Sequence, residues 1–169
     1  MRLSKKMASS SEWCLCAIRE GELDHAEAVR FVGDPGCGAI STFLGVTRDN
    51  FEDKAVEKLS YEAYVAMAEA EMRKLCVRAR ERWTLAKCLI LHRVGEVPVG
   101  GASVIIATSS PHREASLAAT AWLIDELKAT VPIWKKESYK DGHPQWKENK
   151  EWNLKRQQQQ QGNNDESSS

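Results

Sequence analysis

Two β-rich runs separated by a short glycine-containing segment constrain the fold of this chain more than any other feature. The runs CLILHRV (88–94) and ASVIIAT (102–108) flank the segment GEVPVGG, and this arrangement predicts a β-hairpin. Further strands are expected at 13–18, 38–46 and 56–64, and helices at 23–32, 67–83 and about 111–130. A hairpin of adjacent strands, with helices between other strands, favours an α+β fold over a doubly wound parallel sheet.

The expected strands differ in exposure. The run GAISTFLGV (38–46) has the composition of a strand buried on both faces, whereas the alternating pattern at 56–64 predicts a half-exposed strand. The helix 111–130 is expected to end near Thr130, because a residue that precedes proline, here Val131, is disfavoured in helical geometry. After Pro132 the chain is expected to be irregular or to form short strands.

Composition places the chain among single-domain proteins without a strong overall charge. It has 169 residues, of which 42% are hydrophobic, and 24 basic residues balance 24 acidic ones. The polar residues 1–11 and the Gln- and Ser-rich tail 156–169 are expected to be disordered, which leaves a folded domain at 12–155. No run approaches the ~20 apolar residues of a membrane span. Five scattered cysteines without an export signal indicate reduced thiols and a cytosolic protein.

The segment SSPHRE (109–114) is the first candidate binding site. Ser110 suits the N-cap of the following helix and Pro111 its first position, which would place His112 and Arg113 in the first turn. A helix N-terminus favours anions, so a cationic arginine there suggests a bound phosphate or carboxylate. The alternative is an exposed arginine tolerated by solvent and a histidine packed against a neighbour.

The segment VPIWKKE (131–137) is the second candidate. Lys128 lies in the last turn of the preceding helix, where a cation stabilises the helix terminus, but Lys135 and Lys136 have no such structural reason. A lysine beside an apolar wall such as Trp134 can serve as an acid, base or nucleophile. A solvated basic rim is the alternative interpretation.

Helix geometry separates these two candidates. Sixteen residues between His112 and Lys128 correspond to roughly 24 Å along a helix. Either the two ends belong to different sites, or one pocket takes its two ends from two copies of the chain in a symmetric dimer. Arg48, just beyond the apolar run 38–46, is a third candidate, although a plain turn at the end of a strand explains it equally well.

Several other chemistries lack the residues that they require. Cys14 and Cys16 have no matching Cys/His pair in the sequence, so no metal site is expected. Glycine-rich phosphate loops, dinucleotide fingerprints and Ser/His/Asp signatures do not occur, and no cofactor is expected. The basic segment 128–156 leaves a nucleic-acid accessory protein as an alternative, against which the zero net charge counts.

Four segments in order resemble the large, catalytic subunit of molybdopterin synthase. These segments are GAISTFLGVTRDN, LSYEAYVAMAEAEM, ILHRVGEVPVGGASVIIATSSPHREAS and IDELKATVPIWKKE. The resemblance implies an α/β-hammerhead-type fold of the α+β class. It also implies sulfur transfer from the thiocarboxylated C-terminal Gly-Gly of a small ubiquitin-like subunit to cyclic pyranopterin monophosphate, which forms the dithiolene of molybdopterin. A dimer of large subunits with a small subunit at each end is the implied assembly, and neither membrane nor nucleic acid takes part.

The resemblance also assigns roles to the VPIWKKE region. Lys128 and Lys135 correspond to the family's catalytic lysines at the pocket for the carrier tail. Lys136 and Glu137 complete the same segment that contacts the substrate. The remaining alternative is a non-catalytic scaffold that binds a ubiquitin-like tail.

Further positions correspond to anion-binding residues of the family. Arg48, His112 and Arg113 correspond to residues that bind the substrate, and the family places the His-Arg pair in the pocket of the other large subunit. Lys150 is a possible additional anion contact.

Overall fold

The computed structural model of the chain describes residues 13–140 and 145–147. Its elements in chain order are β1 (Cys14–Glu20), α1 (His25–Val32), β2 (Ala39–Val46), β3 (Asn50–Phe51), β4 (Lys54–Ala63), α2 (Val65–Arg82), β5 (Lys87–Pro98), β6 (Ala102–Ser110), α3 (Arg113–Thr130), β7 (Ile133–Tyr139) and β8 (Gln145–Lys147). The two segments expected to be disordered lie outside the described residues. Within the described ranges, no helix is long and apolar enough to cross a membrane.

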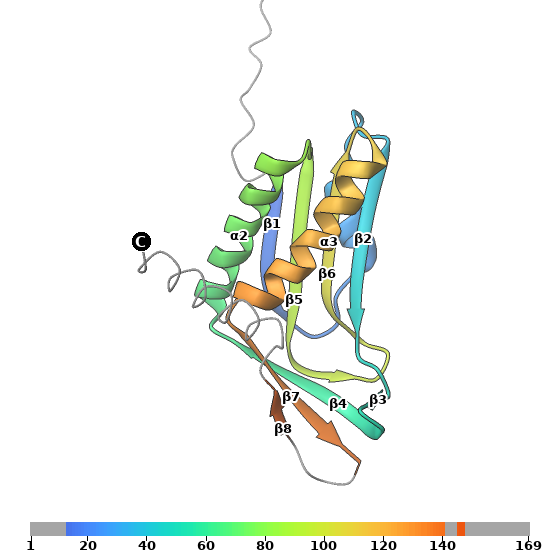
Figure 1. Ribbon diagram of the computed structural model, residues 1–169, viewed down its shortest axis with the longest axis vertical. Coiled ribbons are helices and arrows are strands. Elements are labelled where there is room, and N and C mark those ends of the chain that lie inside the picture. The colour runs from blue at the N-terminus through green and yellow to red at the C-terminus, as the bar shows by residue number, and fades with distance from the viewer. Residues whose placement is uncertain (1–12, 141–144, 148–169) are drawn as a thin grey trace, which may run out of the picture.

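The described strands form one mixed sheet. The order is β2-β6-β5-β4-β7-β8, with β1 beside β5 and β3 beside β4. The β1–β5 pair is parallel and the other described pairs are antiparallel. The long strand β5 joins two parts of the sheet, because its residues 87–92 pair with β6 and its residues 95–98 with β4. In Figure 1, β4, β7 and β8 extend away from the helix-covered part. The prediction of an α+β fold with a mixed sheet is confirmed.

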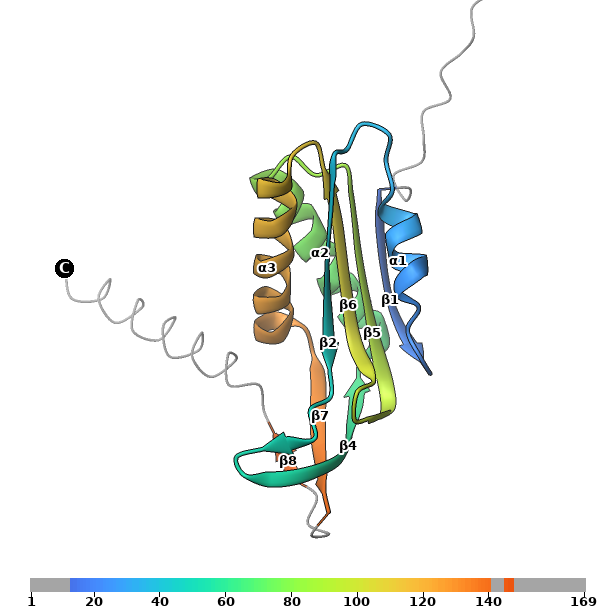
Figure 2. The same ribbon diagram turned by 90° about the vertical axis from the view of Figure 1, so that its right-hand side faces the viewer.

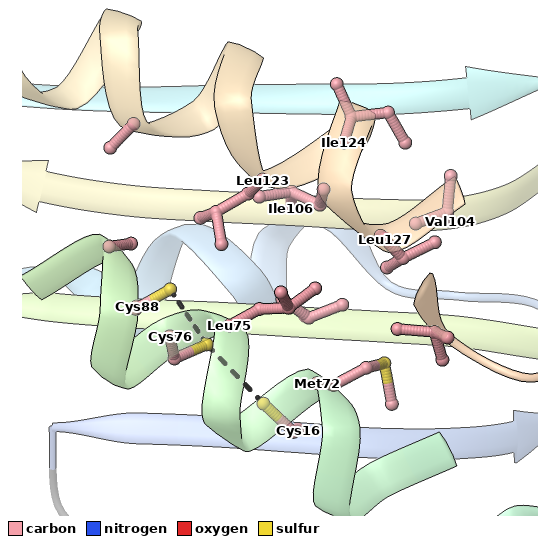
Figure 3. Packing of buried hydrophobic residues seen from close by; sticks show 14 of the residues in the cluster. Cys16, Met72, Leu75, Cys76, Cys88, Val104, Ile106, Leu123, Ile124 and Leu127 are labelled. Atoms are coloured by element: carbon pink, nitrogen blue, oxygen red, sulfur yellow. Dashed lines mark hydrogen bonds between the residues drawn. The ribbon is translucent and has the colours of Figure 1, made fainter. Parts of the chain in front are cut away.

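Helices cover both faces of the upper part of the sheet. α2 and α3 lie on one face and α1 on the other (Figure 2). The larger core cluster, which includes Met72, Ile106 and Leu123, lies between α2, α3 and the sheet (Figure 3). A smaller cluster with Val32 and Leu91 lies beneath α1. Both clusters share strands β5 and β6, so the described chain is a single domain, as expected.

The long helix α3 ends where expected but begins later than expected. Thr130 is its last residue and Val131 is extended, in agreement with the effect of Pro132. The helix begins at Arg113 with His112 as its N-cap, so the expectation that Ser110 caps it was wrong. Ser110 instead ends β6, where it pairs with Ala39, and its hydroxyl donates to the carbonyl of His112. Continued pairing with β2 holds this residue in the sheet.

Strand β2 is less buried than its composition suggested. It lies at the edge of the sheet, and the exposed fractions of Ile40, Leu44 and Val46 are 43%, 38% and 53%. Its other face packs under α3, where the Ser41 hydroxyl donates to that of Ser116 at 2.9 Å. Double-sided burial was therefore a wrong expectation, because α1 covers mainly β5 and β6. After Pro132 the chain forms the regular strand β7 rather than irregular structure.

Candidate active site

A cavity of about 540 Å³ lies where the end of β2, strands β4 and β7, and the C-terminal end of α3 meet. Four of the predicted site residues line it: Arg48, Lys128, Lys135 and Glu137. Its remaining walls are largely apolar and include Phe51 and Val104. Side chains distant in the sequence thus converge on one concave surface.

Strand alternation decides which residues of VPIWKKE face the cavity. Lys135 and Glu137 lie on one face of β7, and their cross-strand partners on β4, Tyr61 and Leu59, line the same cavity. Trp134 and Lys136 alternate with them and do not line the cavity. The expectation that Trp134 forms an apolar wall beside a lysine was therefore wrong for Lys135.

The apolar neighbour of the cavity cations is Phe51. Its ring centroid lies 5.9 Å from Lys135 Nζ and 5.8 Å from the guanidinium carbon of Arg48. Both distances are within the range of cation–π attraction, which favours an ammonium or guanidinium group held over an aromatic face. Phe51 thereby helps to position both cations at the cavity.

Glu137 fixes the position of Lys135. Its side chain is only 2% exposed, and Oε1 accepts from Lys135 Nζ at 2.9 Å. The Tyr139 hydroxyl donates to Oε2 of the same carboxylate. A buried carboxylate needs such partners, because an unpaired charge is strongly disfavoured away from water. The Lys135 ammonium is consequently held at the cavity wall rather than extended into solvent.

Lys128 and Arg48 reach the cavity from two other elements. Lys128 lies in the last turn of α3, and Arg48 follows β2 in the turn before β3. Among the described residues that line the cavity, they and Lys135 give three cationic side chains against one carboxylate, that of Glu137. The cavity is therefore suited to an anionic group.

His92 is a cavity residue that the sequence did not single out. It is 4% exposed, and its Nδ1 lies 2.8 Å from the carbonyl oxygen of Arg93, to which it donates. Desolvation lowers the pKa of His92 to about 4, so the imidazole is neutral near pH 7. The Tyr61 ring packs edge-on against it, with centroids 5.0 Å apart. Burial raises the pKa of the Tyr61 phenol, because desolvation disfavours the charged form of this group as well. In the sequence, the only indication of this buried residue was the presence of a histidine inside the apolar run CLILHRV.

We expect His92 to make the fold sensitive to acid. Its pKa is about 4 in the folded state and about 6.5 in the unfolded chain, so below pH 6.5 the unfolded state binds more protons. The free energy of unfolding should therefore fall by about 3 kcal/mol between pH 6.5 and pH 4 on account of this group. Urea unfolding of the wild-type chain and a His92→Asn variant at both pH values measures this difference. Equal acid sensitivity of the two chains would contradict the prediction.

His112 and Arg113 do not line the cavity of their own chain. Both are exposed at the N-terminal end of α3, whereas Lys128 is in its last turn. An 18-residue helix is about 27 Å long, so the two ends cannot contact one small substrate. Lys150 lies outside the described residues.

Comparison with known proteins identifies the family. A family model described as MoaE protein matches residues 18–130. The chain belongs to the MoaE family. It is 54% identical over 133 residues to a molybdopterin synthase catalytic subunit of Culex quinquefasciatus, covering 77% of this chain and 85% of the relative. A human protein of the same description is 54% identical over 125 residues, covering 74% of this chain and 66% of the relative.

Solved structures agree with this assignment. A molybdopterin synthase structure from Staphylococcus aureus has a TM-score of 0.74 and 31% identity, covering 80% of this chain and 96% of that one. A chain from a complex of subunits 1 and 2 of molybdopterin-converting factor from Helicobacter pylori shares the fold, with a TM-score of 0.65, 22% identity, and coverage of 80% and 91%. The predictions of an enzyme and of a role in molybdopterin synthesis are confirmed, and the scaffold alternative is not favoured.

Proposed function

We propose that this chain transfers sulfur from the thiocarboxylated C-terminal glycine of a small ubiquitin-like subunit to cyclic pyranopterin monophosphate. The product is molybdopterin, whose dithiolene receives both sulfurs. The observation that carries the proposal is the cavity in which Arg48, Lys128 and Lys135 meet within a chain of the MoaE family. An anionic substrate and a carboxylate-like tail both require such a cationic site.

The reaction divides into attack and release. The thiocarboxylate sulfur forms a bond to a carbon of the pterin substrate as the bond from that carbon to its oxygen breaks, and the departing oxygen takes up a proton. The acyl group of the carrier glycine thereby becomes linked to the substrate through sulfur. Water then adds to this thioester carbonyl, and the tetrahedral oxyanion collapses to a free carrier carboxylate and a thiolate on the pterin. Two such transfers supply the two sulfurs. Because the carrier brings the nucleophile, the chain needs no cysteine of its own in the cavity.

Lys128 and Lys135 are assigned to the release step. An ammonium group held in a largely apolar cavity stabilises a developing oxyanion more strongly than one in water. The same groups can give a proton to a leaving atom or take one from water. Glu137 supports this role, because its contact with Lys135 Nζ holds the ammonium in one position.

Arg48 is assigned to the substrate phosphate. A guanidinium group offers several donors in one plane and binds phosphate oxygens in pairs. The Phe51 ring below this side chain limits its freedom. Glu137 completes the substrate-contacting wall with Lys135. Lys136 lies on the other face of β7 and Lys150 lies outside the described residues, so the roles of both remain predictions from the resemblance.

A second copy of the chain would supply His112 and Arg113. These residues are too far along α3 to reach the cavity of their own chain, and the apolar side chains of Ile40, Leu44 and Val46 leave an exposed row on the edge strand β2. A symmetric contact between two chains would bury such a row and bring two sites together. We therefore propose a dimer of these chains inside a heterotetramer, with one small subunit at each end.

The proposed setting is the cytosol. All five cysteines are free thiols in the structure, as expected where glutathione keeps thiols reduced. The proposed reaction requires neither metal nor nucleotide, and neither membrane nor nucleic acid is a proposed partner.

Reconstitution of the reaction tests the proposal. The full-length chain is mixed with cyclic pyranopterin monophosphate and the small subunit, prepared either as the thiocarboxylate or as the ordinary carboxylate. We expect molybdopterin to form only with the thiocarboxylate, while both carriers bind the chain. Binding of both carriers without product under any condition would overturn the enzyme proposal in favour of a scaffold.

A further inference from the structure

Four cysteine sulfurs meet in the core between β1, β5 and α2, away from the cavity. Cys16 Sγ lies 3.7 Å from Cys14 Sγ and 3.6 Å from Cys76 Sγ. The Cys88 thiol donates to Cys76 Sγ at 3.1 Å. The row of sulfurs from Cys16 to Cys88 is visible in Figure 3. No cysteine lines the cavity described above, so this cluster has no part in the proposed sulfur transfer.

The fold itself creates this convergence. Cys14 and Cys16 are two residues apart on β1 and therefore project from the same face of the strand. β1 runs parallel to β5, with Cys14 in register with Cys88. Cys76 lies on the buried side of α2, which packs on this face of the sheet. The sequence shows only an isolated Cys-x-Cys pair. Its partners, Cys76 and Cys88, are distant along the chain, so only the folded structure brings the four thiols together.

The separations match those of a metal–thiolate site. The sulfurs of Cys14, Cys16 and Cys76 all lie within 4.8 Å of one another. A zinc–thiolate bond is about 2.3 Å long, so sulfurs within this span of one another can bind one ion. In a tetrahedral zinc site, thiolate sulfurs are about 3.8 Å apart. This is close to the separations of Cys16 Sγ from Cys14 Sγ, 3.7 Å, and from Cys76 Sγ, 3.6 Å. An ion could enter with little movement of the backbone.

The donor set limits which ion fits. Thiolates select soft ions such as Zn²⁺ and Cu⁺ over Mg²⁺ or Ca²⁺, which require oxygen ligands. Cys88 would act from outside the first coordination sphere, because its thiol donates to the sulfur of Cys76. Cys14 is only partly buried, whereas Cys16, Cys76 and Cys88 are buried. Entry from the Cys14 side is therefore the shortest route from solvent.

We propose that Cys14, Cys16 and Cys76 form a binding site for a soft metal ion, Zn²⁺ or Cu⁺, that ties β1 to α2. Each coordinating thiol releases one proton as it binds, so occupancy should rise with pH. The bound ion would be structural, because the cluster is separate from the cavity. The proposal differs from the sequence-based expectation of no metal site, which rested on the absence of a matching Cys/His pair for Cys14 and Cys16.

Metal titration of the reduced, metal-free, full-length chain tests this proposal. Zn²⁺, Cu⁺ and Cd²⁺ are added separately. The metal bound per chain is measured by elemental analysis, the thiolate-to-cadmium charge-transfer absorption by ultraviolet spectroscopy, and the melting temperature by circular dichroism. We expect a single tightly bound ion per chain, the charge-transfer band with Cd²⁺, and a higher melting temperature with the preferred ion. Stronger binding of Zn²⁺ or of Cu⁺ identifies which of the two the site takes.

Matched cysteine variants locate the site. Cys14→Ser changes a half-buried residue and should leave the fold intact, while Cys37→Ser removes a free thiol outside the cluster. We expect metal affinity to fall by roughly 100-fold or more in Cys14→Ser and to be unchanged in Cys37→Ser. Absence of a charge-transfer band in the wild type, or equal bands in the wild type and Cys14→Ser, would overturn the proposal. A disulfide between Cys76 and Cys88 that persists in the chain purified under reducing conditions would also overturn it, because Cys76 would then have no thiol to bind a metal ion.

Discussion

Replacing Lys135 with alanine is expected to lower the rate of molybdopterin formation by about 10²–10³-fold while the small subunit still binds. The physical reason is the position of this ammonium group, which Glu137 holds at the cavity wall at 2.9 Å. Loss of a positioned donor removes stabilisation that exists only in the transition state, so turnover should fall more than affinity. Single-turnover kinetics and a binding titration with the thiocarboxylated carrier measure the two effects separately.

Two further variants make this prediction decisive. Lys135→Ala removes the ammonium group 2.9 Å from the buried Glu137 carboxylate and could destabilise the fold. The double variant Lys135→Ala/Glu137→Gln removes that charge and should be folded but equally slow. Lys136→Ala changes the neighbouring lysine on the opposite face of β7, which does not line the cavity, so its loss of activity should be much smaller than that of Lys135→Ala. Equal losses for Lys135 and Lys136 would contradict the assignment based on the cavity.

Arg113→Ala is expected to lower kcat/KM although Arg113 does not line the cavity of its own chain. A charge-assisted hydrogen bond contributes about 1.5–3 kcal/mol, which corresponds to a loss of roughly 10–100-fold in kcat/KM. In the proposed dimer this guanidinium group meets the substrate phosphate from the second chain. The wild type and the variant are compared by steady-state kinetics across concentrations of cyclic pyranopterin monophosphate.

Glu114→Ala provides the matched control for Arg113. Both residues are exposed and adjacent in the first turn of α3, but only Arg113 can pair with a phosphate. We expect near wild-type kinetics for Glu114→Ala, and an unchanged dimer in both variants by light scattering. An Arg113→Ala variant with full activity would show that the anion-binding role was assigned wrongly.

Local sequence patterns predicted most of the elements of this fold. The hairpin of β5 and β6 and the end of α3 before Pro132 depend on neighbouring residues, and these expectations were confirmed. Neighbouring residues also fix the start of α1. Asp24, for example, caps α1 by accepting from the amide of Ala26 at 2.7 Å. Signals of this kind act within a few residues and are legible in a single sequence.

The features that the sequence did not reveal depend on pairing between distant segments. The choice between Lys135 and Lys136 as the cavity residue follows from the register of β7 with β4, in which Lys135 pairs with Tyr61. The burial of His92 depends on the strands and helices around β5. The cysteine cluster depends on the parallel register of β1 and β5. No local pattern encodes such registers. The position of β2 at the edge of the sheet is likewise set by distant segments, so its apolar composition wrongly suggested burial on both faces.

Mixing two chains with impaired activity tests the central claim most directly. Lys128→Ala and Arg113→Ala chains are purified separately, combined in equal amounts, and allowed to exchange subunits, with exchange verified by mass labels. In a mixed dimer one cavity carries both substitutions and the other carries neither. The account predicts recovery of about a quarter of wild-type activity, since about half of the dimers are mixed and each has one intact site. A mixture that exchanges fully yet stays as inactive as its components would contradict a site built from two chains.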